Sequence, residues 1–118
     1  MQDKIVINDY IENDPLSEEN LDKTLETVNK IRLSFPKKSI WIYSGYRWSE
    51  IFNDGVYLTK DCDGWKRREI VKQCTVMVDG RYIDSQRDIS LRWRGSKNQN
   101  CVDIQQSLHQ NKIVLYQN

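Results

Sequence analysis

Metal-binding and membrane-spanning patterns are scarce in this sequence of 118 residues. It has one histidine, and its three cysteines, at positions 62, 74 and 101, show no CxxC or CxxxCxxC spacing. This argues against a zinc or iron–sulfur site built from this chain alone, and the odd cysteine count argues against a disulfide framework. No apolar run approaches the roughly 18 residues of a membrane helix, and no signal peptide is recognisable. We therefore expect a soluble, cytoplasmic protein with no metal and no membrane partner.

Charge of one sign does not dominate the whole chain, but it is unevenly distributed. The net charge of +1 implies no polyanionic partner by itself. Residues 1–26 hold eight acids and two bases, whereas residues 27–118 hold nine acids and sixteen bases. The two parts could therefore attract different partners. The length fits one domain, which we place at residues 1–118.

Short apolar runs alternate with helical patterns along the chain. Strands are expected at 4–7, 39–44, 75–80 and 112–116, and helices at 17–35, 45–52 and 65–74. Residues 103–110 are ambiguous, and residues 81–101 read mostly as loop. The run at 39–44 is almost continuously apolar, as expected of a strand covered on both faces. Strand–helix alternation predicts an α/β fold with a few parallel strands flanked by helices and an irregular C-terminal segment.

Five motifs along the chain resemble those of one enzyme family. Together they are similar to the activating protein of anaerobic ribonucleotide reductase, a radical S-adenosylmethionine (SAM) family. The resemblance runs from about residue 12 to the C-terminus. The motifs read DPL (14–16), KSIWIYSGYRWSE, VMVDGRY, DISLRWRGSKNQ and CVDIQQSL.

The resemblance implies a partial (βα) barrel with an iron–sulfur cluster and SAM at its open mouth, and here that barrel would be truncated. The family's CxxxCxxC loop has no counterpart in this sequence. Its GG[DE] turn, which approaches SAM through the backbone, corresponds to Glu12, Asn13 and Asp14, a vestigial turn in which the glycines are lost. The arginine of the family's NQR becomes Asn100. On these departures we expect no catalytic residue, no cofactor and no enzyme activity.

The stretch RWRGSKNQN (92–100) keeps much of the family's loop motif. Two interpretations remain open for it. The amide and guanidinium groups could satisfy loop carbonyls and strand ends, or they could form a reused contact surface.

Aromatic and basic side chains are the candidates for binding a partner, because tryptophan and arginine are common interface anchors. Each also has a structural alternative, as a core ring or as part of a solvated helix face. A basic helix face could instead contact phosphates, so nucleic acid is a weaker candidate partner. The candidates are Trp48, Trp65, Lys66, Arg67, Arg68, Lys72, Trp93 and Arg94.

Three functional hypotheses follow. The leading one is a non-enzymatic protein-binding module that inhibits or adapts a protein or nucleoprotein complex, for example a phage inhibitor of a CRISPR effector. The alternative is a fragment that binds the anaerobic reductase and modulates its activation. The third is a radical SAM enzyme whose cluster half comes from another chain. An exposed sheet edge could also pair two copies into a homodimer.

Overall fold

A computed structural model describes residues 4–52 and 64–117. The irregular segment expected at 53–64 falls almost wholly outside these ranges, as does Cys62. The described chain is a mixed α/β structure built on one four-stranded sheet. The α/β prediction is thereby confirmed, whereas the single-domain assignment stays a prediction.

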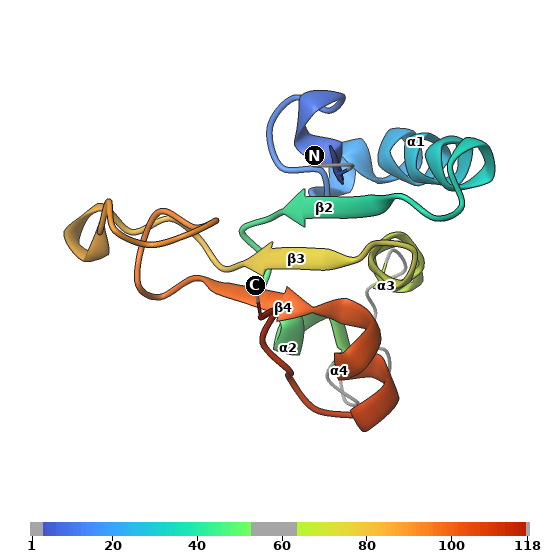
Figure 1. Ribbon diagram of the computed structural model, residues 1–118. Coiled ribbons are helices and arrows are strands. Elements are labelled where there is room, and N and C mark those ends of the chain that lie inside the picture. Colours follow the sequence, from blue (N-terminus) through green and yellow to red (C-terminus); the bar gives the residue numbers. More distant parts are fainter. Residues whose placement is uncertain (1–3, 53–63, 118) are drawn as a thin grey trace.

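The sheet follows the order of the chain (Figure 1). Strands β1 (Lys4–Val6), β2 (Ser39–Tyr43) and β3 (Val76–Asp79) are parallel neighbours. β4 (Asn100–Asp103) pairs antiparallel with β3, with Met77 opposite Val102. The first three strands match the expected ones. The fourth begins at the end of the segment that we expected to be loop and reaches the stretch that we left ambiguous.

Helices occupy the connections between the strands, and one more helix follows the last strand. They are η1 (Ile7–Asp9), η2 (Glu18–Asn20), α1 (Leu21–Ser34), α2 (Trp48–Phe52), α3 (Gly64–Lys72), η4 (Asp84–Gln86) and α4 (Ile104–Gln110). The expected helix at 17–35 is therefore a 3₁₀ turn followed by α1. In Figure 1 the arrows of β2 and β3 point toward the long loop of residues 81–99 and away from α1 and α3.

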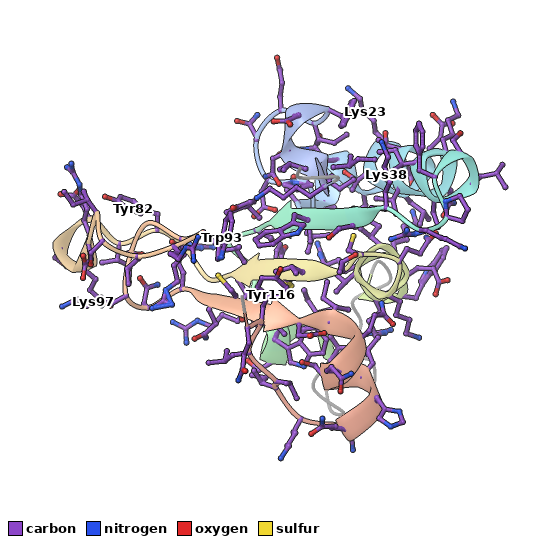
Figure 2. All side chains as sticks on the ribbon, viewed as in Figure 1. Lys23, Lys38, Tyr82, Trp93, Lys97 and Tyr116 are labelled. Atoms are coloured by element: carbon purple, nitrogen blue, oxygen red, sulfur yellow. The ribbon has the colours of Figure 1, made fainter. Side chains whose placement is uncertain are left out.

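Both faces of the sheet are covered, as the apolar run at 39–44 predicted. Alternate side chains on a strand point to opposite faces. Ile40 and Ile42 of β2 therefore join the larger core beneath the helices, while Trp41 joins a smaller core on the other face. Trp93 and Tyr116 pack on Trp41, with ring centroids 5.0 and 5.2 Å away (Figure 2). The C-terminal segment thus helps to close the second face.

The expected final strand at 112–116 is wrong. Leu115 forms only an isolated bridge with Val102. The tail nevertheless runs along β4, because Asp103 N donates to Val114 O at 2.8 Å and Tyr116 N donates to Cys101 O at 2.8 Å. The ambiguous stretch before it is helical and forms α4.

Among the described residues, none of the helices combines the length and the apolar character that crossing a bilayer requires.

Candidate functional site

The carboxyl ends of β2 and β3 open onto two adjoining depressions, which we call the mouth. Their volumes are about 1060 and 340 Å³. Both are lined by Asp14, Gly45, Arg81 and Tyr82. Ligands of open α/β sheets bind at this end of the strands, so the mouth is the candidate site.

The carboxylate of Asp14 organises the mouth. Its Oδ1 accepts hydrogen bonds from Leu16 N and Ser44 Oγ, both at 2.9 Å, and its Oδ2 accepts one from Gly45 N at 2.8 Å. The side chain therefore ties the turn before η2 to the end of β2. The acid that the resemblance singled out is a structural clamp in this chain.

The turn at Glu12, Asn13 and Asp14 keeps an unusual backbone without glycine. Asn13 has φ = 64°, a left-handed conformation that asparagine tolerates better than most residues. Asn20 Nδ2 holds the turn by donating to Glu12 O and Asp14 O, each at 2.9 Å. Asn13 also lines the smaller depression. The turn therefore places a side chain on the wall of this depression.

Two glycines keep the mouth open. A Cβ on Gly45 would lie 3.1 Å from Arg81 Cγ and 3.3 Å from Asp14 Oδ2, which is tighter than ordinary contact. Gly80 has φ = 93°, a conformation that L side chains rarely adopt. The backbone at the ends of β2 and β3 therefore depends on these positions.

The loop of residues 92–100 is fastened to the residues after β3. Gln99 Oε1 accepts from Gly95 N at 3.0 Å and from Ser96 N at 3.1 Å, while Gln99 Nε2 donates to Gly80 O at 3.0 Å. Asn98 Nδ2 donates to Arg81 O at 2.7 Å. These contacts support the structural interpretation of the RGSKNQ motif, because its amides satisfy loop backbone groups.

The strand end of β3 contributes a buried carboxylate. Asp79 is 3% exposed, and its Oδ2 accepts from Trp48 N at 2.8 Å while its Oδ1 accepts from Asn100 N at 3.2 Å. One side chain therefore fixes the start of α2 and the start of β4 against β3.

The basic residues of α3 do not form one surface. Arg67 is 8% exposed; its Nε donates to Leu16 O at 2.8 Å and its guanidinium lies over the Tyr46 ring. Arg67 therefore belongs to the packed interior and does not fit an open contact face. Lys66 Nζ lies 2.7 Å from Asp22 Oδ1. Trp65 is 53% exposed, and Arg68 and Lys72 line a separate hollow described below.

The remaining candidates are divided between core and loop. Trp48 is 7% exposed and packs on Phe52. Trp93, at φ = 73°, packs on the smaller core, where Lys4 Nζ lies 4.2 Å from its ring centroid. Arg94 Nε is buried, and no described residue accepts a hydrogen bond from it. The structure does not gather the predicted partner-binding residues into one patch.

Most lining residues of the mouth were not singled out from the sequence, and Ser44, Arg81 and Tyr82 are among them. Ser44 follows β2 directly, and Arg81 and Tyr82 follow the turn after β3. Arg81 and Tyr82 are exposed, whereas Ser44 is buried. Their position directly after parallel strands was the available signal.

Comparison with known proteins assigns this chain to a family. The chain belongs to the family described as "4Fe-4S single cluster domain", whose model matches residues 13–102. Its sequence is homologous to anaerobic ribonucleoside-triphosphate reductase-activating proteins over 86 residues, which is 73% of this chain. The resemblance to that family is therefore confirmed.

Three relatives show the extent of the similarity. The chain is 34% identical to the activating protein of Escherichia coli strain K12, 31% to that of Vibrio cholerae and 31% to that of Enterobacteria phage T4. The matched region covers 48%, 48% and 46% of these proteins, so the chain spans about half the length of the curated relatives it matches. No solved structure matches the chain significantly.

The described residues do not fit an iron–sulfur cluster. They contain no group of three histidine, cysteine or acidic side chains placed to hold a metal ion. Burial raises the pKa of the Cys74 thiol to about 12, and its Sγ donates to Ile70 O at 3.3 Å. Burial also raises the pKa of Cys101. Both shifts disfavour the thiolate, which is the form that binds metal.

Two expectations change in the light of the matches. The prediction that the chain is not an enzyme is contradicted, because its curated relatives are reductase-activating proteins and its family model describes a 4Fe–4S domain. Neither the matches nor the described residues point to an inhibitor of a CRISPR effector. The relatives favour the alternative, which is a connection to the anaerobic reductase.

Proposed function

We propose that this chain acts in the activation of an anaerobic ribonucleotide reductase and that it does so by binding the reductase. The observation that carries the proposal is the homology over 86 residues to reductase-activating proteins of bacteria and of a phage. The fold proposed with it is part of a radical-SAM-type (βα) barrel. Three parallel strands with intervening helices agree with this architecture.

The mouth is the surface proposed to face the reductase. The matched region includes the Asp14 clamp, Gly45 and Gly80, which together shape the mouth. Beside them Arg81 and Tyr82 are exposed, on the long loop that projects from the sheet (Figure 2). An arginine next to a tyrosine at the rim of a depression is a common composition for an interface anchor.

Binding to the purified anaerobic reductase tests the proposal. Under anaerobic conditions, biolayer interferometry is expected to detect binding of the immobilised chain, and an intact activating protein from the same organism is expected to compete. The double variant Arg81→Ala/Tyr82→Ala should bind at least about tenfold more weakly, a loss typical of one interface anchor. Lys23→Ala, on the exposed side of α1, is the control and should bind normally. The proposal fails if the intact activating protein binds the reductase and this chain does not.

A further inference from the structure

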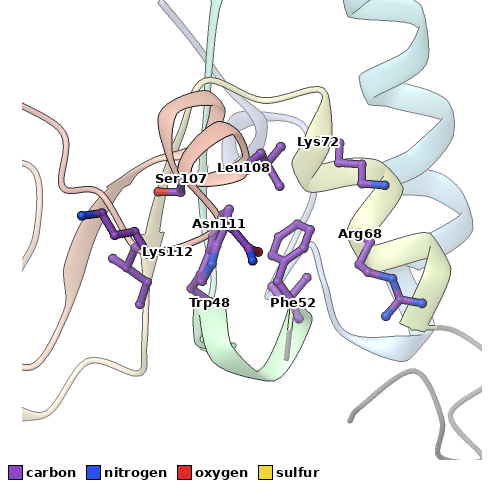
Figure 3. A pocket seen from close by; sticks show the side chains of 10 residues that line it. Trp48, Phe52, Arg68, Lys72, Ser107, Leu108, Asn111 and Lys112 are labelled. Carbon is purple, nitrogen blue, oxygen red and sulfur yellow. The ribbon is translucent and has the colours of Figure 1, made fainter. Parts of the chain in front are cut away.

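A second hollow lies between α2, α3 and α4, and it shares no lining residue with the mouth. Its volume is about 540 Å³, within the roughly 300–1,000 Å³ that ligand pockets usually have. We call it the docking groove. Figure 3 shows the side chains that line it.

The floor of the docking groove is apolar. Trp48 and Phe52 of α2 form a tilted ring pair with centroids 4.2 Å apart. Leu108 of α4 adds to the floor, and Ile113, which is 46% exposed, stands on its rim. Apolar side chains that remain in contact with water in a concave surface favour a ligand that covers them.

The sides of the docking groove are cationic. Arg68 and Lys72 are four residues apart and so lie on one face of α3. Lys112 stands on the other side of the Trp48 and Phe52 rings (Figure 3). Lys72 and Lys112 therefore place positive charge on both sides of the groove, whereas Arg68 already has an interaction within the chain. An occupant with negative charge on both flanks would therefore meet complementary charge.

We propose that the docking groove binds an acidic amphipathic peptide segment of a protein partner. A bulky apolar side chain of the segment covers the floor, and carboxylates on either side of it pair with Lys72 and with Lys112. This is the pattern by which an amphipathic helix occupies a groove. The partner is defined by this chemistry alone, and the groove is independent of reductase binding at the mouth.

The exposed apolar surface of the floor comes from Phe52, Leu108 and Ile113 more than from Trp48, and it favours a peptide over single-stranded nucleic acid. Bases bind such surfaces by stacking on exposed aromatic faces. Trp48 is only 7% exposed, and its ring packs on Phe52, so little ring face remains for a base. The aliphatic contributions of Leu108 and Ile113 suit an apolar side chain better than a planar base.

A random peptide display library, selected on the purified chain, tests the proposal. The double variant Lys72→Glu/Lys112→Glu reverses charge on both sides of the groove at exposed positions. Lys23→Glu/Lys37→Glu makes the same change in net charge at exposed positions outside the groove and serves as the matched control. Equal melting temperatures of the three proteins establish that the fold is kept.

The expected result has three parts. Enriched peptides combine acidic residues with a bulky apolar residue, and they shift the indole N–H resonance of Trp48 in a nitrogen-15 spectrum. They also bind the groove variant at least tenfold more weakly than the control variant. Enrichment without acidic residues, or equal affinity for the two variants, overturns the proposal. Two other results also overturn the proposal, provided that the groove variant abolishes them and the control variant does not. One is binding of an oligothymidylate probe that is tighter than binding of the peptides, and the other is self-association of the chain.

Discussion

Replacing Asp79 by asparagine should destabilise the chain strongly, although the two side chains have nearly the same shape. In Asp79→Asn the side chain keeps its shape, but one of its two oxygens becomes an amide group that cannot accept a hydrogen bond. Either Trp48 N or Asn100 N then loses its partner in a site where Asp79 is 3% exposed. A hydrogen bond to a charged group contributes about 1.5–3 kcal/mol, so we expect a loss of about 2–3 kcal/mol. Asp79→Ala removes both acceptors and should cost about 3–6 kcal/mol.

Urea unfolding, followed by tryptophan fluorescence, measures the loss as a lower transition midpoint. The matched control is Asp103→Asn. Asp103 caps α4 by accepting one hydrogen bond, from Gln106 N at 3.1 Å. Asparagine is as good an N-cap as aspartate, so the control should change the free energy of unfolding by less than about 0.5 kcal/mol. Both substitutions replace a carboxylate with an amide, but only Asp79→Asn removes a hydrogen bond, and it does so at a buried position.

The reasoning is refuted if Asp79→Asn costs no more than Asp103→Asn. Such a result would mean that the two backbone N–H groups find other partners once the carboxylate is gone. A changed slope of the free energy with urea would point instead to a change in the surface exposed on unfolding.

Three further predictions concern other parts of the molecule. In Gly45→Val the new Cβ would lie 3.1 Å from Arg81 Cγ, and the two methyl groups add further volume. Overpacking of this kind costs on the order of 1–3 kcal/mol, so the melting temperature should fall by several degrees. An unchanged melting temperature would show that the neighbouring side chains move aside at no cost. Because burial raises the pKa of Cys74 from 9.0 to about 12, the unfolded chain loses a proton between these values that the folded chain keeps, and stability falls as pH rises. Urea unfolding at about pH 8 and about pH 10 measures how much the free energy of unfolding falls between the two values, and this fall should be smaller in Cys74→Ala by on the order of 1 kcal/mol. An equal fall in both proteins would contradict a raised pKa for Cys74. Gln99→Ala frees the loop that this side chain fastens, so limited proteolysis should cut between residues 81 and 99 several times faster than in Lys97→Ala, and equal rates would count against the fastening role.

The local pattern of apolar residues was enough to predict the parallel strands and α1. The runs that became β1, β2 and β3 are apolar and β-branched, and the helical spacing of Leu21, Leu25 and Val28 identified α1. Each signal lies within one short stretch of the chain. Elements whose stability comes mostly from such local patterns are the ones that sequence predicts well.

The antiparallel strand β4 was missed because what makes these residues a strand is a neighbour distant in the sequence. β4 has only two buried residues, Cys101 and Val102, between polar ends, so its own sequence is a weak strand signal. It becomes a strand because β3 offers an edge beside it. The opposite error occurred at 112–116, whose β-branched residues favour a strand although the tail makes only an isolated bridge there.

The candidate site was predictable in place but not in detail. The family motifs pointed to Asp14 and to the loop around Gln99, which lie at the mouth, but the partner-binding candidates chosen from the sequence do not line it. A run of basic residues does not show which side of α3 faces the core. In the structure Arg67 points into the interior, while Arg68 and Lys72 border the docking groove. That groove joins side chains from α2, α3 and α4, which meet only in the folded chain.

The C-terminal tail, which is hydrogen-bonded to β4, gives the sheet one occupied edge and one open edge. The outward backbone groups of β4 at Cys101 and Asp103 are bonded to the C-terminal tail, so that side offers no free ladder to another strand. At the opposite side, no other strand of the described chain pairs with the outer edge of β1. A further strand can therefore be added to this sheet on one side only. Any added strand, from this chain or another, must join beside Lys4–Val6, which leaves the β4 side unchanged.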